Sequence, residues 1–415
     1  MGETFRAEPA EIAGFGNFVG ENVADYERIM GLLREAGTTN DFSGLMSALT
    51  DPVVTLQLAT QSRWVDMGET LGSIASGLAK SAWIFHGAEA ENAEIFRQHV
   101  RSVERGPGEN GFDIDVDPAN SRRKIVVDPY PGAVNTGSPT PIDVSAPPHS
   151  EPDIRGLIEE TSGWLAEIDA TVEQYGHWSP IRQAIKPISG NWEELRRIGE
   201  VYSKAGTAVG TIGNDVAAQT ARIDGSWDGK AAHAFADYSR NATDYMEWEA
   251  ALGRMLREGF EKAAAEFENA VGAALRVIIN EFEKVITVRG TSGVVKALAK
   301  SIPLLGTAAQ LGDLAKALIA IGQEVLPLIE EVRRGVEAFQ EFIEFAQDPV
   351  GFAKEKGQDA VNEKLAPYKE ELERGRHRVQ VLRDVDTLMG VDDLRDRPQA
   401  PYEPETGGDA REGIA

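Results

Sequence analysis

The chain contains no cysteine, which excludes disulfide bonds, thiol catalysis and thiolate metal sites. Histidine is also scarce: the six histidines are scattered, and no two have the i, i+4 spacing of a helical zinc site. Basic residues are outnumbered, with 42 Lys and Arg against 67 Asp and Glu and a formal net charge of -25. This acidic excess argues against nucleic acid or an anionic membrane as the main partner.

Long apolar runs are missing as well. The N-terminal stretch MGETFRAEPAEIAGFGNF has no basic segment followed by an apolar one, so a Sec-type signal peptide is not expected. The most apolar region, 302–329, contains Asp313, Lys316 and Glu324, which makes it a poor membrane-spanning candidate. We interpret it as a buried bundle helix; the alternative is a surface that oligomerises or touches lipid.

No group of residues has the spacing of a catalytic site. The many carboxylates supply acids and bases everywhere, so no single pair of them is informative. We therefore expect a non-enzymatic protein with no catalytic residues, no cofactor and no metal.

What the chain does contain is helical periodicity on both sides of one short turn, Trp227-Asp228-Gly229. Apolar residues recur there at spacings of three and four, which keeps one stripe of each helix facing a partner. The pattern predicts an antiparallel hairpin with this turn at its tip, where Trp227 either covers the tip or is presented to another protein. The predicted packing residues are Leu195, Ile198, Tyr202, Val209 and Ile212 before the turn, and Phe235, Tyr238 and Leu252 after it.

The same patterns divide the chain into parts. Helical spacing from about residue 10 to 104 predicts a first hairpin, and nine of the 20 prolines fall in a following linker. That linker is expected to be a flexible or partly extended tether, with a possible short strand over 124–127. Asn191 and Glu194 resemble a capping box at the start of the main hairpin. The predicted parts are the N-terminal hairpin 1–105, the linker 106–152, the main hairpin domain 153–288, a C-terminal helical region 289–385 and a disordered acidic tail 386–415. The expected fold is all-α, with the two hairpins forming a body like a four-helix bundle.

The segment from Ser226 to Phe235, SWDGKAAHAF, resembles the turn of the WXG100 (ESAT-6-like) family of type VII secretion substrates. The flanking segments ISGNWEELRRIGEVYSKAG and YSRNATDYMEW are similar to WXG-type export modules of larger actinobacterial proteins. In this family the Trp-x-Gly turn acts with a Tyr-x-x-x-Asp/Glu element as an export signal. The resemblance therefore implies that Trp227 and Gly229 form the recognised turn. It implies Tyr245 and Glu249 as a possible signal, although they lie closer to the turn than the family usually places them.

The resemblance also implies partners and a location. WXG100-like hairpins pair, so the main hairpin is expected to pair with a small WXG100-like protein or with its own N-terminal hairpin, as in fused PE/PPE-type and EspB-like proteins. The type VII secretion machinery would be the further partner. The protein would be cytoplasmic before export and then secreted or cell-surface by a Sec-independent route. Homo-oligomers and membrane contact stay open, and no nucleic acid is expected.

Two other functions stay open beside this one. The chain could be the delivery module of a membrane-active or oligomerising effector whose activity lies in 290–415. It could also be a cytosolic scaffold or chaperone encoded in a secretion locus.

Overall fold

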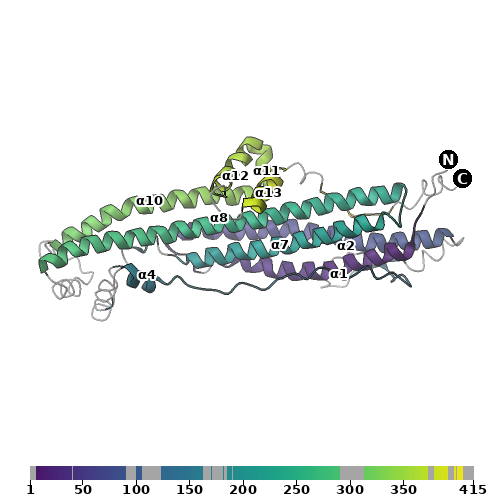
Figure 1. Cartoon of the computed structure of the whole chain (residues 1–415), viewed down its shortest axis with the longest axis horizontal. Helices are drawn as coiled ribbons and strands as arrows, with labels where there is room; N and C mark the ends of the chain where they lie inside the picture. The colour runs from purple at the N-terminus through teal and green to yellow at the C-terminus, as the bar shows by residue number, and fades with distance from the viewer. Residues whose placement is uncertain are drawn as a thin grey trace.

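The computed structural model describes residues 6–39, 41–89, 100–104, 123–161, 170, 181, 185–188, 190–289, 313–372, 378–390, 397, 398 and 400–404. Within them most regular structure is helical, and the long helices lie side by side along one axis (Figure 1). The prediction of an all-α fold built from helical hairpins is confirmed.

Two hairpins form the body of the molecule. Their helices are α1 (Pro9–Leu33) and α2 (Thr50–Glu89) in the first, and α7 (Trp192–Ile223) and α8 (Lys230–Arg289) in the second. Two short 3-10 helices, η1 (Arg34–Gly37) and η2 (Gly44–Leu49), join α1 to α2. Since α1 contacts α7 and α2 contacts α8, the two hairpins of one chain pack together as a four-helix body.

The apolar stripes of the main hairpin face this body. Of the predicted packing residues, Tyr238 is half-buried. The others are buried in the core: Leu195, Ile198, Tyr202, Val209, Ile212, Phe235 and Leu252.

The start of α7 is capped. The Asn191 side chain accepts the Glu194 N–H at 3.2 Å. The predicted capping box is only half formed, because the Glu194 carboxylate pairs with Arg197 and His149.

A small sheet adds to the helices. Strand β1 (Val100–Glu104) pairs antiparallel with β2 (Arg123–Val127), with Val100 opposite Val127. The possible strand over 124–127 is thus present. The helical prediction is wrong at 100–104, where β-branched valines favour an extended chain.

The second half of the proline-rich linker is not a plain tether. Residues 136–150, here called the strap, lie against α7 and run antiparallel to it. The Thr136 carbonyl accepts from Arg222 near the end of α7, and the Ser150 carbonyl accepts from Asn191 at its start.

Side chains of α7 also hold the middle of the strap. Thr140 donates twice to Asp215, both times at 2.7 Å. Lys204 reaches both Ser145 and Asp143. The prediction of a flexible or partly extended linker did not include these contacts, because they are made with α7, which lies far away in sequence.

The C-terminal region packs on the outside of the body. Helix α10 (Asp313–Gln347) contacts α8 and α2, and α11 (Pro349–Lys356), α12 (Gln358–Leu372) and α13 (Arg378–Met389) lie together beside it (Figure 1). Of the apolar region 302–329, residues 302–312 fall outside the described part of the chain. No helix within the described residues is both long and apolar enough to cross a membrane.

The prediction of a disordered tail over 386–415 is wrong for the residues of that tail that the structure describes. Residues 386–389 belong to α13, and residues 400–404 lie on the helical body with Tyr402 8% exposed. Composition marked this segment as disordered because it is rich in Pro, Gly and Asp. Tyr402 supplies the apolar contact that composition did not reveal.

Candidate functional site

The turn between α7 and α8 is held by its own backbone. The carbonyl of Ile223 accepts the N–H groups of Ser226 and Trp227 at 2.8 and 2.9 Å, which closes the end of α7. Gly229 has a φ of +98°, a conformation that residues with a Cβ rarely adopt. Its N–H donates to the Asp228 carboxylate at 2.6 Å, and its carbonyl accepts from His233 in the first turn of α8. Gly229 therefore permits the reversal of the chain between α7 and α8.

Trp227 covers the tip from inside. Its side chain is 1% exposed and packs on Phe235 and Phe85, at ring-centroid distances of 5.4 and 5.9 Å. Phe15 meets Phe235 edge-on at 5.8 Å, so α1, α2 and α8 all contribute to one aromatic cluster. The indole Nε1 of Trp227 is buried and finds no hydrogen-bond partner among the described residues. Of the two roles expected for Trp227, the structure shows the covering one.

The tip is also bonded to the N-terminal segment. Ala7 forms a β-bridge with Trp227, Glu8 donates to the carbonyl of Ser226 at 2.9 Å, and Asp228 donates to the carbonyl of Arg6 at 2.8 Å. The turn of the second hairpin is thus tied to the segment just before α1. Asp224, Gly225 and Asp228 remain exposed on the outer surface of the turn.

Tyr245 and Glu249 do not lie at the surface. Glu249 is 1% exposed and forms an ion pair with Arg63 of α2 at 2.6 Å. The Trp64 Nε1–H donates to its other oxygen at 2.9 Å, and the Tyr245 hydroxyl donates to the Arg63 carbonyl at 3.4 Å. The pair predicted as a possible signal therefore joins α8 to α2 inside the body.

Further groups complete this buried polar cluster. Arg63 also donates to the Gln347 carbonyl, at the C-terminal end of α10, at 2.8 Å. Burial raises the pKa of Tyr245, and the nearby Glu249 charge adds to the shift. Burial likewise raises the pKa of Tyr202. These phenols stay neutral at physiological pH, so the charges of the cluster are those of Arg63 and Glu249.

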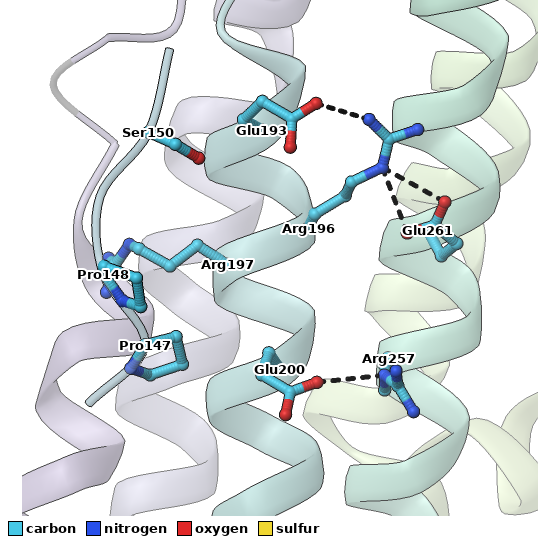
Figure 2. A pocket seen from close by; sticks show the side chains of 9 residues that line it. All are labelled: Pro147, Pro148, Ser150, Glu193, Arg196, Arg197, Glu200, Arg257 and Glu261. Carbon is cyan, nitrogen blue, oxygen red and sulfur yellow. Dashed lines mark hydrogen bonds and ion pairs between the residues drawn. The ribbon is translucent and has the colours of Figure 1, made fainter. Parts of the chain in front are cut away.

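A polar pocket of 240 Å³ lies where the end of the strap meets α7 and α8, and Figure 2 shows its lining. It holds three arginines, but two of them are paired with carboxylates across the helices. Arg196 bonds Glu193 and Glu261, and Arg257 bonds Glu200 at 3.1 Å. The third, Arg197, pairs with Glu194 at 2.7 Å. Because each guanidinium already faces a carboxylate, the pocket offers little net charge to an anionic ligand.

The partners of the candidate residues could not be predicted from the sequence. Arg63 and Trp64 lie in α2, 186 and 185 residues from Glu249, and nothing in local spacing links them to it. Tyr402 had a weak signal, since it is the one aromatic residue of the acidic tail 386–415. Within the described residues, no group of three or more His, Asp or Glu side chains is arranged to hold a metal ion.

The chain matches no known family model, no curated protein and no solved structure. The WXG100 resemblance therefore rests on the residues of the turn and its flanking helices.

Proposed function

We propose that this protein is a non-enzymatic, WXG100-like substrate or accessory protein of a type VII secretion system, recognised through the tip of its main hairpin. One observation carries the proposal: the Trp-x-Gly sequence forms a hydrogen-bonded turn between two long helices that are packed against a second hairpin. A WXG100-like pair has this arrangement of hairpins, and here a single chain supplies both.

The geometry favours recognition of a shaped surface over binding of an inserted tryptophan. Trp227 is buried and fixes the turn from below, while Asp224 and Asp228 are exposed above it. A secretion component would contact the exposed carboxylates, and Trp227 and Gly229 would hold them in place. Pairing with the N-terminal hairpin would replace a separate small WXG100-like partner.

The position of Tyr245 and Glu249 gives them a different role in this proposal. Both are occupied by contacts with Arg63 and Trp64 in the folded chain. They would keep the two hairpins paired during recognition, and direct contact with the machinery would fall to the turn.

Export of Trp227→Ala tests the proposal against a matched control. Truncation of a buried Trp costs about 3–5 kcal/mol, so the control must also lose a buried Trp. Trp192→Ala is suitable: Trp192 is equally buried but lies at the other end of α7, whose 32 residues span about 48 Å. Both variants and the wild type would be expressed with a type VII secretion system, and the folded, exported protein would be measured in the culture supernatant.

We expect Trp227→Ala to lose most of its export and Trp192→Ala to keep it, once each is normalised to its folded fraction. Asp224→Lys, a surface change that leaves the core intact, should also reduce export. Equal export of all the folded variants would exclude recognition through the tip.

A further inference from the structure

A groove between α2 and α8, next to the tip, is filled by the chain's own C-terminal segment. Of its described residues, Arg397 and Ala400 are hydrogen-bonded to α8 and Tyr402 is hydrogen-bonded to α2. Burial alternates along its end: Tyr402 and Pro404 are buried, whereas Pro401 and Glu403 are exposed. This alternation is that of an extended chain with one face against a surface. We call residues 397, 398 and 400–404 the latch.

Tyr402 occupies a seat shaped for an aromatic ring. It packs on Phe235 at 5.2 Å and on Tyr238 at 5.4 Å between ring centroids. On the α2 side the seat is open because residue 77 is a glycine. A Cβ at Gly77 would lie 2.3 Å from the Tyr402 ring, far inside contact distance. The aromatic ring is therefore accommodated by the absence of one side chain.

Hydrogen bonds fix the backbone of the latch in this seat. The Tyr402 N–H donates to the Ser73 hydroxyl at 3.0 Å, and the Tyr238 hydroxyl donates to the Ala400 carbonyl at 2.9 Å. Ser73 and Tyr238 also bond each other at 3.1 Å. One small network thus bonds the N–H of the inserted tyrosine and the carbonyl of the residue two before it.

A second anchor lies at the start of the latch. The guanidinium of Arg397 sits over the Tyr245 ring, 5.6 Å from its centroid, and donates to its hydroxyl at 3.4 Å. Tyr238 and Tyr245 are seven residues apart, so they share a face of α8 about 10 Å apart. Arg397 and Tyr402 are five positions apart in the sequence, and an extended chain of that length can span this distance.

The latch sequence suits such a groove. In RPQAPYEP the prolines recur every third residue, at 398, 401 and 404, which favours an extended polyproline II-like chain before binding. A segment that is already extended loses little entropy when it docks in an aromatic-lined groove. Arg at one end and Tyr near the other then supply the side chains that the groove contacts.

We propose that this groove is a binding site for extended peptides in which a tyrosine is flanked by prolines and preceded by an arginine, and that the latch fills it in cis. The latch is held by the side chains of Arg397 and Tyr402 and by two backbone hydrogen bonds. A peptide from another molecule that supplies the same groups could therefore take its place. A tethered segment has an effective concentration of about millimolar, so a competitor of equal intrinsic affinity must exceed that concentration to displace the latch.

A labelled peptide RPQAPYEP, added to the full-length chain, tests the groove directly. In Tyr402→Ala the seat is vacated. Titrating this variant up to about millimolar concentration against the labelled peptide should therefore raise the fluorescence anisotropy of the peptide. The wild type, whose seat is filled, should bind at least tenfold more weakly. Adding Gly77→Ala to Tyr402→Ala should abolish binding, because the new Cβ blocks the ring.

Gly20→Ala in the Tyr402→Ala background is the matched control. It makes the same change in a helix at a position with no atom within 4 Å of the new Cβ, so binding should persist. Absence of binding to Tyr402→Ala, or equal binding to all four chains, would overturn the proposal. The peptide assay needs no secretion system, so its outcome is separate from that of the proposed export function.

Discussion

At the residue scale, Glu249 decides how the two hairpins meet. A carboxylate in the apolar stripe of α8 is costly unless it is paired, and here Arg63 and Trp64 supply the partners from α2. A shift of either helix by one turn would leave both charges buried without a partner. The pair therefore fixes the register of the body more than it adds net stability.

Removing one partner of this pair should be expensive. We expect Glu249→Ala and Arg63→Ala each to lower the free energy of unfolding by about 3–5 kcal/mol, because each leaves an uncompensated buried charge. The double variant should be clearly less destabilised than the sum of the two losses. Urea unfolding followed by circular dichroism measures all three chains.

An exposed ion pair provides the comparison. Arg240 and Asp237 are paired on α8 with side chains 65% and 71% exposed, so Asp237→Ala should change stability by less than about 1 kcal/mol. If Glu249→Ala behaved like Asp237→Ala, the buried pair would have no part in fixing the register.

At the element scale, the strap matches α7 in length. From Thr136 to Ser150 the chain advances 14 residues, about 46 Å when fully extended. From Asn191 to Arg222, α7 advances 31 residues, also about 46 Å. Prolines at 139, 141, 147 and 148 help to keep the strap extended. The connection between the hairpins therefore has no slack along α7.

A taut strap should tolerate lengthening better than shortening. Deleting Ala146 and Pro147 removes about 7 Å of reach and should break the contacts of Ser145 with Lys204 or of His149 with Glu194. We expect a loss of about 1–3 kcal/mol from these contacts. Inserting Gly-Ser after Ala146 should cost less than about 1 kcal/mol, since the extra residues can bulge outward. Equal effects of deletion and insertion on urea unfolding would contradict a taut strap.

The helices could be predicted from the sequence, but their tertiary contacts could not. The stripe from Leu195 to Ile212 carries a local period that burial in a helical body explains. The half-formed box at Asn191 shows the limit: the cap is local, whereas Glu194 is drawn to Arg197 and His149. Proline content predicts an extended strap but cannot say which helix it lies on. Tyr402 is missed for the same reason, because its seat is made by Gly77 and Phe235.

At the scale of the whole molecule, the contacts that close the body come from one chain. The N-terminal segment pairs with the Trp227 turn, Arg63 pairs with Glu249, and Arg197 donates to the Glu35 carbonyl at 2.8 Å. These contacts lie at the tip, along the middle and toward the far end of α7. A second chain is not needed to bury the stripes of the main hairpin.

Unfolding should therefore be independent of protein concentration. A body assembled from two chains gains stability by mass action, so a hundredfold rise in concentration would add about 2.7 kcal/mol. A body closed within one chain gains nothing, and we expect the urea midpoint to stay constant across that range. A midpoint that rises with concentration would mean that the hairpins pair between chains, with the strap bridging two molecules. Because the strap has no slack along α7, such exchange would first require its contacts with α7 to open.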